Sequence, residues 1–209
     1  MVEEAAGRHE TTIFLASRNA KKLGELERIL ADSAPGLKVV GLDDVPGYPE
    51  PIEDQATFAD NALLKARAGF AATGLVTLAD DSGLCVDALN GMPGVLSARW
   101  SGQPKSDDRN NSLLLEQLED VPEERRGAAF ICAVAVCSAE GEFVETGEMR
   151  GRVIREMRGI DGFGYDVIFV PEESTDGRTS AELSKAEKDA ISHRGKALRA
   201  VAARLRNLA

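Results

Sequence analysis

The chain has 209 residues, of which 43% are hydrophobic and 29% are charged, a composition that allows one large or two small soluble domains with a sizeable core. Its formal net charge of -10 argues against a protein that wraps a nucleic-acid backbone, because such binding needs many Lys and Arg contacts. We therefore expect no nucleic-acid partner. A small anion needs only a local basic pocket.

The sequence contains no run of about 18 apolar residues, so we expect no membrane partner. Residues 1–10 are polar and acidic, unlike a signal peptide, and predict a loose N-terminus on a cytoplasmic protein. The cysteines Cys85, Cys132 and Cys137 lie in apolar stretches without the paired spacing of metal ligands. We expect them to be small core residues in a reducing compartment.

The N-terminal part of the chain predicts a strand, a loop, a helix and a second strand. Residues 11–16 form a short apolar run, and residues 23–30 carry leucine and isoleucine at helical spacing. Residues 37–42 predict the second strand. Residues 43–55 contain three prolines and predict an exposed loop. A long helix should then cover residues 57–72, with its apolar residues repeating every four positions.

The middle of the chain alternates strand and turn signals. Residues 76–79 predict a strand that ends at the acidic pair Asp80 and Asp81, and residues 84–88 predict that the strand resumes after a turn. Residues 107–119 have the pattern of an amphipathic helix.

The C-terminal half predicts the centre of the sheet. Residues 128–136 are almost continuously apolar, which is typical of a strand covered on both faces. Residues 142–148 alternate and follow a tight turn, so part of the sheet should be antiparallel. A strand at 167–170 and a final helix with an apolar stripe at 198–205 complete one mixed α/β domain over residues 1–209, with two lobes around a cleft.

The segment from Ser17 to Lys22 lies where a strand passes into a helix. Backbone N–H groups and the helix dipole favour an anion at such a position, and Lys22 could add a positive charge. The segment lacks the Walker sequence and so is not a P-loop of that class. The simpler alternative is that Ser17 or Asn19 only caps the helix.

The adjacent carboxylates of Asp80 and Asp81 repel each other unless a cation or solvent stabilises both. Mg²⁺ suits such a site, because it binds a few carboxylates together with phosphate oxygens and water. The alternative is a solvated Asp-Asp-Ser-Gly turn. Glu53, Asp54 and Asp60 lie in or just after the proline-rich loop and could supply another ligand, although acids there are usually plain surface residues.

Two further segments could contact a nucleoside. Residues 162–166 place two aromatic side chains and a carboxylate in a turn, where they could stack on a base and read its edge, or simply lead a strand into the core. Ser192, His193 and Arg194 open the last helix, either as a cap or as nucleotide contacts. Lys65 alone indicates no function, and its interpretation depends on the other segments. With two histidines in the chain, we expect no multi-histidine metal centre. Together the segments indicate a nucleotide hydrolase.

The order of these segments resembles the inosine triphosphate pyrophosphatase family, house-cleaning enzymes that hydrolyse non-standard purine nucleoside triphosphates. The resemblance covers residues 13–205 and is carried by LASRNAKKLGEL, TFADNALLKARA, ADDSGLCVDALNGMPGVLSARWSG, GFGYDVIF and AELSKAEKDAISHRGKAL. It implies an elongated mixed α/β fold and a homodimer. It also implies Mg²⁺-dependent cleavage of dITP, ITP or XTP to a monophosphate and pyrophosphate, which keeps these nucleotides out of DNA and RNA.

The resemblance also implies a role for each matching residue. The triphosphate would be held by Ser17, Arg18, Asn19, Ala20, Lys21, Lys22, Lys65 and Ser82. Glu53 and Asp81 would bind magnesium, and Asp81 would also be the proton acceptor. The nucleoside would be enclosed by Phe163, Gly164, Tyr165, Asp166, Lys188, His193 and Arg194.

The chain departs from the usual family pattern at two places. Residues 54–56 read Asp-Gln-Ala where a Thr-Gly pair is common, beside the expected ligand Glu53, and Val167 replaces a frequent proline. A carboxylate bound to Mg²⁺ is a weak base, so Asp80 stays an alternative to Asp81 as proton acceptor. Two other functions stay open, a pyrophosphatase for pyrimidine or modified nucleotides and a non-catalytic nucleotide sensor. The sequence identifies no group that rejects the 2-amino group of guanine.

Overall fold

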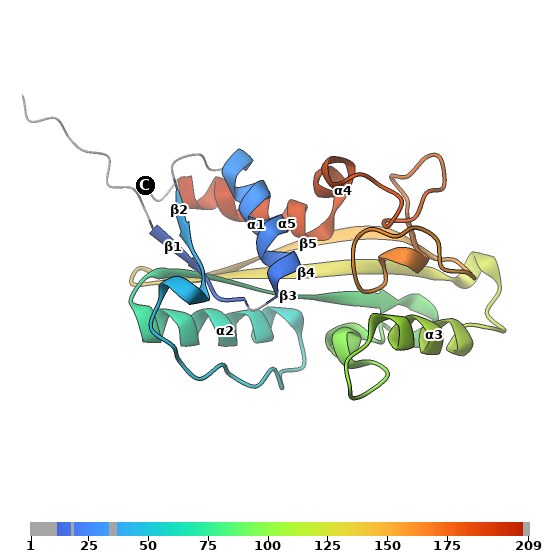
Figure 1. Cartoon of the computed structure of the whole chain (residues 1–209), viewed down its shortest axis with the longest axis horizontal. Helices are drawn as coiled ribbons and strands as arrows, with labels where there is room; N and C mark the ends of the chain where they lie inside the picture. Colours follow the sequence, from blue (N-terminus) through green and yellow to red (C-terminus); the bar gives the residue numbers. More distant parts are fainter. Residues whose placement is uncertain (1–11, 18, 34–36, 207–209) are drawn as a thin grey trace, which may run out of the picture.

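The structure, a computed structural model, describes residues 12–17, 19–33 and 37–206 (Figure 1). The expected loose N-terminus at residues 1–10 lies outside this part. The strands are Thr12–Leu15 (β1), Lys38–Val40 (β2), Val76–Val86 (β3), Gly127–Ser138 (β4), Gly141–Val153 (β5) and Phe169–Pro171 (β6). The α-helices are Ala20–Ser33 (α1), Phe58–Thr73 (α2), Asp107–Gln117 (α3), Lys185–Ile191 (α4) and His193–Arg206 (α5). Short 3-10 helices span Leu42–Asp44 (η1), Asp87–Leu89 (η2), Gly94–Arg99 (η3), Glu123–Arg125 (η4) and Asp166–Ile168 (η5).

The strands form one mixed sheet in the order β2-β1-β3-β4-β5-β6. β1 runs parallel to β2 and β3, whereas β3, β4, β5 and β6 pair antiparallel in succession. The predicted mixed sheet is confirmed. The strand expected at residues 128–136 is β4, which lies between β3 and β5 and is buried on both faces.

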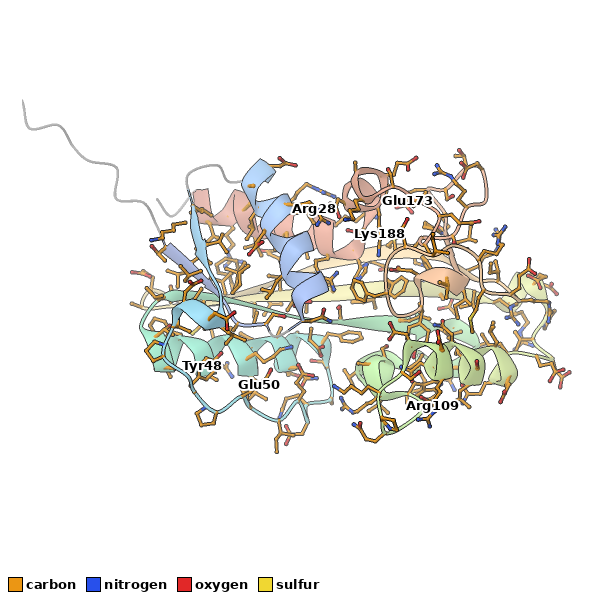
Figure 2. All side chains as sticks on the ribbon, in the orientation of Figure 1. Arg28, Tyr48, Glu50, Arg109, Glu173 and Lys188 are labelled. Carbon is orange, nitrogen blue, oxygen red and sulfur yellow. The ribbon has the colours of Figure 1, made fainter. Side chains whose placement is uncertain are left out.

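Helices cover both faces of the sheet (Figure 1). α1 and α5 pack on one face against Cys132 and Val134 of β4, and α2 packs on the other face against Ala133. This division follows from the alternation of side chains along a strand. Arg28 of α1 donates through Nε to Asp189 of α4 at 3.0 Å, which joins these two helices on the same side of the sheet (Figure 2). The α/β fold with a mixed sheet flanked by helices is as predicted.

One prediction about the acidic segment is wrong. The sequence predicted that the strand stops at the acidic pair, but β3 continues through it to Val86, with Asp80 opposite Val134 and Asp81 opposite Ala133. The Asp-Asp-Ser-Gly sequence favours a turn locally. The long apolar strand β4 supplies backbone partners along this whole stretch, and pairing with it overrides the local preference.

Two smaller differences lie near the C-terminal end. Helix α4 was not predicted, although Ser184 and Glu187 form the capping box that marks its start in the sequence. The strand expected at 167–170 begins instead with η5, and β6 covers only the residues after it.

The predicted loop of residues 43–55 begins inside η1 and otherwise contains neither helix nor strand. Among the described residues, the helices are all too short or too polar to cross a membrane.

Helix α5 packs closely on β5 at Gly147. A Cβ atom at this position would lie 2.0 Å from the His193 carbonyl oxygen and 2.6 Å from the Ala197 nitrogen, both of which are backbone atoms. We expect Gly147→Ala to lower the free energy of unfolding by about 1–3 kcal/mol, because α5 must shift to make room. Urea unfolding measures this change.

Gly24→Ala is the matched control, because its Cβ would have as nearest atom an Arg28 side-chain nitrogen at 3.8 Å. We expect this variant to gain up to about 1 kcal/mol from the higher helix propensity of alanine. Equal stability of Gly147→Ala and the wild type would show that α5 does not pack on β5 in this way.

Candidate active site

A cleft of about 1090 Å³ opens beside the middle of β3. β1 pairs with β3 as far as Leu15 and Leu78, and the chain then turns away into α1. Residues 80–83 of β3 therefore have no neighbouring strand on that side among the described residues, and they line the cleft. The cleft thus lies at the carboxyl end of β1, and a crevice at the carboxyl end of a strand in an open α/β sheet is a common place for a ligand.

The cleft brings together residues from all the segments that the sequence singled out. It is lined by Ser17, Asn19, Glu53, Lys65, Asp80, Asp81, Ser82, Phe163, Gly164, Tyr165, Asp166, Lys188, His193 and Arg194. The predicted contacts of Arg18, and of the side chains of Ala20, Lys21 and Lys22, lie outside the described residues.

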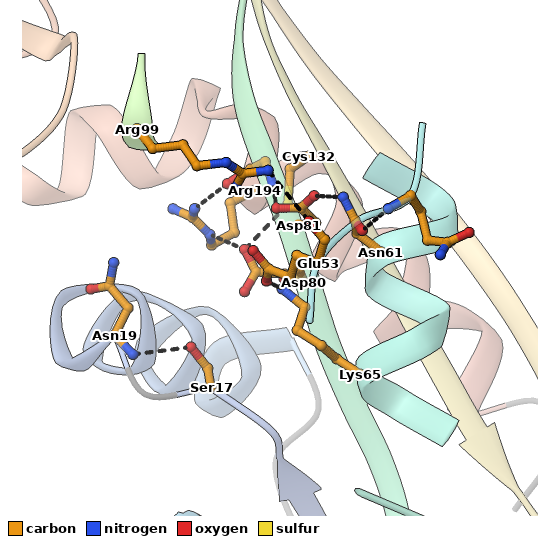
Figure 3. Close-up of polar contacts among 12 residues, drawn as sticks. Ser17, Asn19, Glu53, Asn61, Lys65, Asp80, Asp81, Arg99, Cys132 and Arg194 are labelled. Carbon is orange, nitrogen blue, oxygen red and sulfur yellow. Dashed lines mark hydrogen bonds and ion pairs between the residues drawn. The ribbon is translucent and has the colours of Figure 1, made fainter. Parts of the chain in front are cut away.

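The two adjacent acids point to opposite faces of the sheet, as neighbours on a strand must. Asp80 faces α5, where its Oδ2 lies 3.4 Å from Nε of Arg194, and both side chains are almost fully buried. Asp81 faces α2, where its Oδ2 accepts a hydrogen bond from Nδ2 of Asn61 at 3.0 Å (Figure 3). Its Oδ1 accepts from the backbone N–H of Ser82 at 2.9 Å. The two carboxylates thus have different partners.

The start of α5 combines a cap with contacts to the cleft. The Ser192 hydroxyl accepts from the N–H of Gly195 at 3.0 Å, and the Arg194 guanidinium donates to Oγ of Ser82 at 2.9 Å. The His193 ring stacks on Phe130, with ring centroids 5.0 Å apart and planes at 14°. Both roles considered for this segment, the cap and the approach to the cleft, are therefore compatible.

Lys65 joins the proline-rich loop to β3. Its Nζ donates to the Asp80 carbonyl oxygen at 2.6 Å and to Oε1 of Glu53 at 2.5 Å. Burial acts to lower the Lys65 pKa, but the nearby carboxylates of Asp80, Glu53 and Asp81 outweigh it, and the pKa is raised. Lys65 is therefore a cation at neutral pH. Arg99 adds a second tie to the loop, because it donates to the Glu53 carbonyl oxygen at 3.3 Å.

The carboxylates beside Lys65 have the chemistry of a magnesium site. Among the described residues, no group of three or more His, Cys, Asp and Glu side chains is placed to hold a metal. Mg²⁺ commonly takes only one or two carboxylates, however, and receives its remaining oxygens from phosphate and water. Glu53 and Asp81 both line the cleft and offer such oxygens. These residues fit Mg²⁺ bound together with a polyphosphate.

The far end of the cleft is built by the turn at residues 163–166. The Asp166 carboxylate accepts from the Phe163 N–H at 2.8 Å and from Nζ of Lys188 at 2.5 Å. Lys188 Nζ and Arg194 Cζ lie 5.1 and 5.8 Å from the centre of the Phe163 ring. An aromatic ring with cationic donors beside it can hold a heteroaromatic base.

Sequence reasoning missed several residues of the site. Asn61 holds Asp81, and Arg99, Lys105 and Asp107 line the cleft. Asn61 had a signal, because it lies four residues before Lys65 and so on the same helix face. The other three come from η3, α3 and the segment between them, and their approach to the cleft depends on how these elements pack.

A model of the Ham1 family matches residues 13–204. The chain belongs to the Ham1 family. A dITP/XTP pyrophosphatase of Corynebacterium efficiens is 57% identical to this Ham1 chain over 203 residues, which cover 94% of it and 98% of the relative. A dITP/XTP pyrophosphatase of Mycolicibacterium paratuberculosis is 59% identical over 198 residues, which cover 94% and 97%.

Solved structures agree with this membership. A nucleoside-triphosphatase, also named dITP/XTP pyrophosphatase, from Mycobacterium abscessus is 56% identical, covers 91% of this chain and 98% of its own, and superposes with a TM-score of 0.75. A HAM1 protein from Coxiella burnetii is 40% identical, covers 94% and 99%, and has a TM-score of 0.84. The family resemblance inferred from the sequence is confirmed.

Tyr165 gives this site a pH-dependent contribution to stability. Its hydroxyl donates to the Ser97 carbonyl oxygen at 2.9 Å, and burial, with a smaller effect of Asp107, raises its pKa above the ordinary value of 10.0. Above that pH the unfolded state releases the Tyr165 proton and the folded state keeps it. The unfolded state then binds fewer protons, so stability falls as the pH rises.

We expect Tyr165→Phe to lower the free energy of unfolding by about 1 kcal/mol at neutral pH, because the hydrogen bond to Ser97 is lost. We also expect its unfolding free energy to fall less steeply than that of the wild type above about pH 10, since phenylalanine releases no proton. Urea unfolding at several pH values measures both quantities. Parallel curves for the two proteins would contradict the assigned cause.

Proposed function

We propose that the chain is a nucleoside triphosphate pyrophosphohydrolase that acts on non-standard purine nucleotides such as dITP, ITP and XTP. The observation that carries the proposal is that one cleft joins acids and cations suited to a polyphosphate, around Lys65 and Asp81, with the aromatic turn at Phe163. The relatives named dITP/XTP pyrophosphatase match nearly their full length, which supports the same assignment. Removal of such nucleotides would cleanse the nucleotide pool.

We further propose that residues 1–209 act as one catalytic domain, because a single sheet runs through the described part. The proposal includes a homodimer, which the family resemblance implies. It also includes a cytoplasmic location, which the polar sequence of residues 1–10 favours.

The polyphosphate would lie along the open side of β3. Backbone N–H groups at the start of α1, within the segment from Ser17 to Lys22, would hold its terminal oxygens together with Lys65. Ser82 presents its hydroxyl to the same cleft, where Arg194 already donates to it at 2.9 Å. The raised pKa keeps Lys65 charged for this role.

The acids beside Lys65 would carry the metal and the proton transfer. Glu53 and Asp81 would hold Mg²⁺, which when bound neutralises phosphate charge and favours pyrophosphate as the leaving group. We propose that Asp81 accepts the proton of the water that attacks the α-phosphorus. Asp80 is less suited, because it is 2% exposed and paired with Arg194. Asn61 holds the Asp81 carboxylate in orientation through the bond at 3.0 Å.

The base would bind at the turn of residues 163–166, with His193 and Tyr165 completing the wall. Hypoxanthine and xanthine present an acceptor oxygen at position 6, where adenine presents an amino donor. Nζ of Lys188 and Cζ of Arg194 lie 5.1 and 5.8 Å from the Phe163 ring centre, and the donors that these side chains carry favour the oxygen. Adenine would place its amino donor against these cationic donors, which disfavours it.

The direct test is pyrophosphate release in the presence of Mg²⁺ from dITP, XTP, dATP, dGTP, dTTP and dCTP, with magnesium-free controls. We expect dITP and XTP to be turned over well above the standard nucleotides. Preferred release from dTTP or dCTP would keep the chemistry but refute the base assignment. Absence of release from every nucleotide, in a protein that still binds them, would indicate a sensor.

We expect Asp81→Asn to lower kcat by about 10²- to 10⁴-fold, the usual contribution of a general base, while nucleotide binding persists. Asp80→Asn is the matched comparison, because it makes the same change one residue earlier. Since Asp80 pairs with Arg194, we expect Asp80→Asn to alter KM more than kcat. Steady-state kinetics with dITP and a binding titration separate the two effects. The reverse pattern would make Asp80 the proton acceptor.

A further inference from the structure

Gly164 lies in the turn that lines the base end of the cleft, and helix α3 holds both of its backbone polar groups. The Gly164 N–H donates to Oδ2 of Asp107 at 2.7 Å. The Gly164 carbonyl oxygen accepts from Nδ2 of Asn111 at 2.8 Å. Asp107 and Asn111 are four residues apart, so they stand on one face of α3 and reach the turn together.

Asn111 is committed to this contact. It is 1% exposed, and its Nδ2 also donates to the Asp107 carbonyl oxygen at 2.9 Å. Both amide hydrogens therefore bond to carbonyl oxygens, which fixes the orientation of the carboxamide. Burial makes the loss of such a donor costly for the groups that it serves.

The Gly164 peptide depends on these bonds, because the bond that closes the turn joins its neighbours Phe163 and Asp166 and leaves Gly164 with little else to hold it. Its φ of +62° is a conformation that favours glycine, and a Cβ at this position would have no atom within 4 Å. The two residues that follow are fixed differently, Tyr165 through its hydroxyl on Ser97 and Asp166 through Lys188. Helix α3 thus fixes the Gly164 peptide inside a turn whose two ends are joined by the bond from the Phe163 N–H to the Asp166 carboxylate.

The geometry points to Asp107 and Asn111 as positioning residues that hold the turn of residues 163–166 in the conformation that receives the purine. This inference rests on the proposed function and assigns the two residues a part in its base end. Gly164 then contributes to base binding through its backbone conformation, because its N–H and carbonyl groups already bond to side chains of α3. If the turn is correctly placed for only a fraction of the time, the dissociation constant of a ligand at the base end rises by the inverse of that fraction.

The test compares two ligands that occupy opposite ends of the cleft. IMP contains the purine, and inorganic pyrophosphate does not. We expect Asp107→Ala to weaken IMP binding about tenfold, as loss of one hydrogen bond to a charged group implies, while pyrophosphate binding in Mg²⁺ changes less than about twofold. Isothermal titration calorimetry on the full chain measures both affinities.

Asp108→Ala is the matched control. Asp108 is the next residue on the same first helical turn, it is exposed, and no hydrogen bond joins it to residues 163–166 in the described structure. Asp108→Ala removes the same favourable interaction with the helix dipole as Asp107→Ala but no bond to the turn. We therefore expect both ligands to bind to it as they bind to the wild type. Asp107→Asn keeps an acceptor oxygen and should recover part of the IMP affinity.

Unchanged IMP binding in Asp107→Ala would overturn the inference, and so would an equal loss for IMP and pyrophosphate, which indicates general damage to the fold. Pyrophosphate release from dITP by the wild type is measured separately. Its absence would contradict the proposed function, whereas the comparison of Asp107 with Asp108 tests the positioning role through binding alone.

Discussion

The antiparallel pairing of β3 with β4 is the constraint on which the site depends. It extends β3 through the acidic pair and fixes which face each side chain takes. Asp80 is thereby directed to α5 and Asp81 to α2. A turn at this point would have exposed both carboxylates to solvent. The strand instead gives two neighbouring acids of the same type different partners, and this difference allows them different roles.

The cleft holds its cations by ion pairing. Lys65 is paired with Glu53, Lys188 with Asp166 and Arg194 with Asp80. Buried charges are costly unless paired, so these carboxylates keep the cations in place when no anionic ligand is bound. A chain with a net charge of -10 can therefore keep cationic side chains facing the cleft. Side chains held in advance need little rearrangement when substrate charge arrives, which favours catalysis.

The two ends of the cleft are positioned by different parts of the fold. The acidic end is built on β3 and α2, which are packed in the core around Ala62 and Ala66. The aromatic end is a turn held from outside by α3 and η3, through the bonds to Gly164 and Tyr165. The long strands β4 and β5 span the distance between them (Figure 1).

The sequence by itself determined the elements with strong local signals, such as the apolar strand β4 and the amphipathic helix α2, and the motifs from Ser17 to Arg194 that placed the chain in its family. Only the tertiary structure decided the course of β3, because its turn-like residues pair with a strand far along the chain. It also decided the partners of Asp81 and Gly164. Asn111 is 53 residues from Gly164, and no local pattern encodes a contact between elements so far apart.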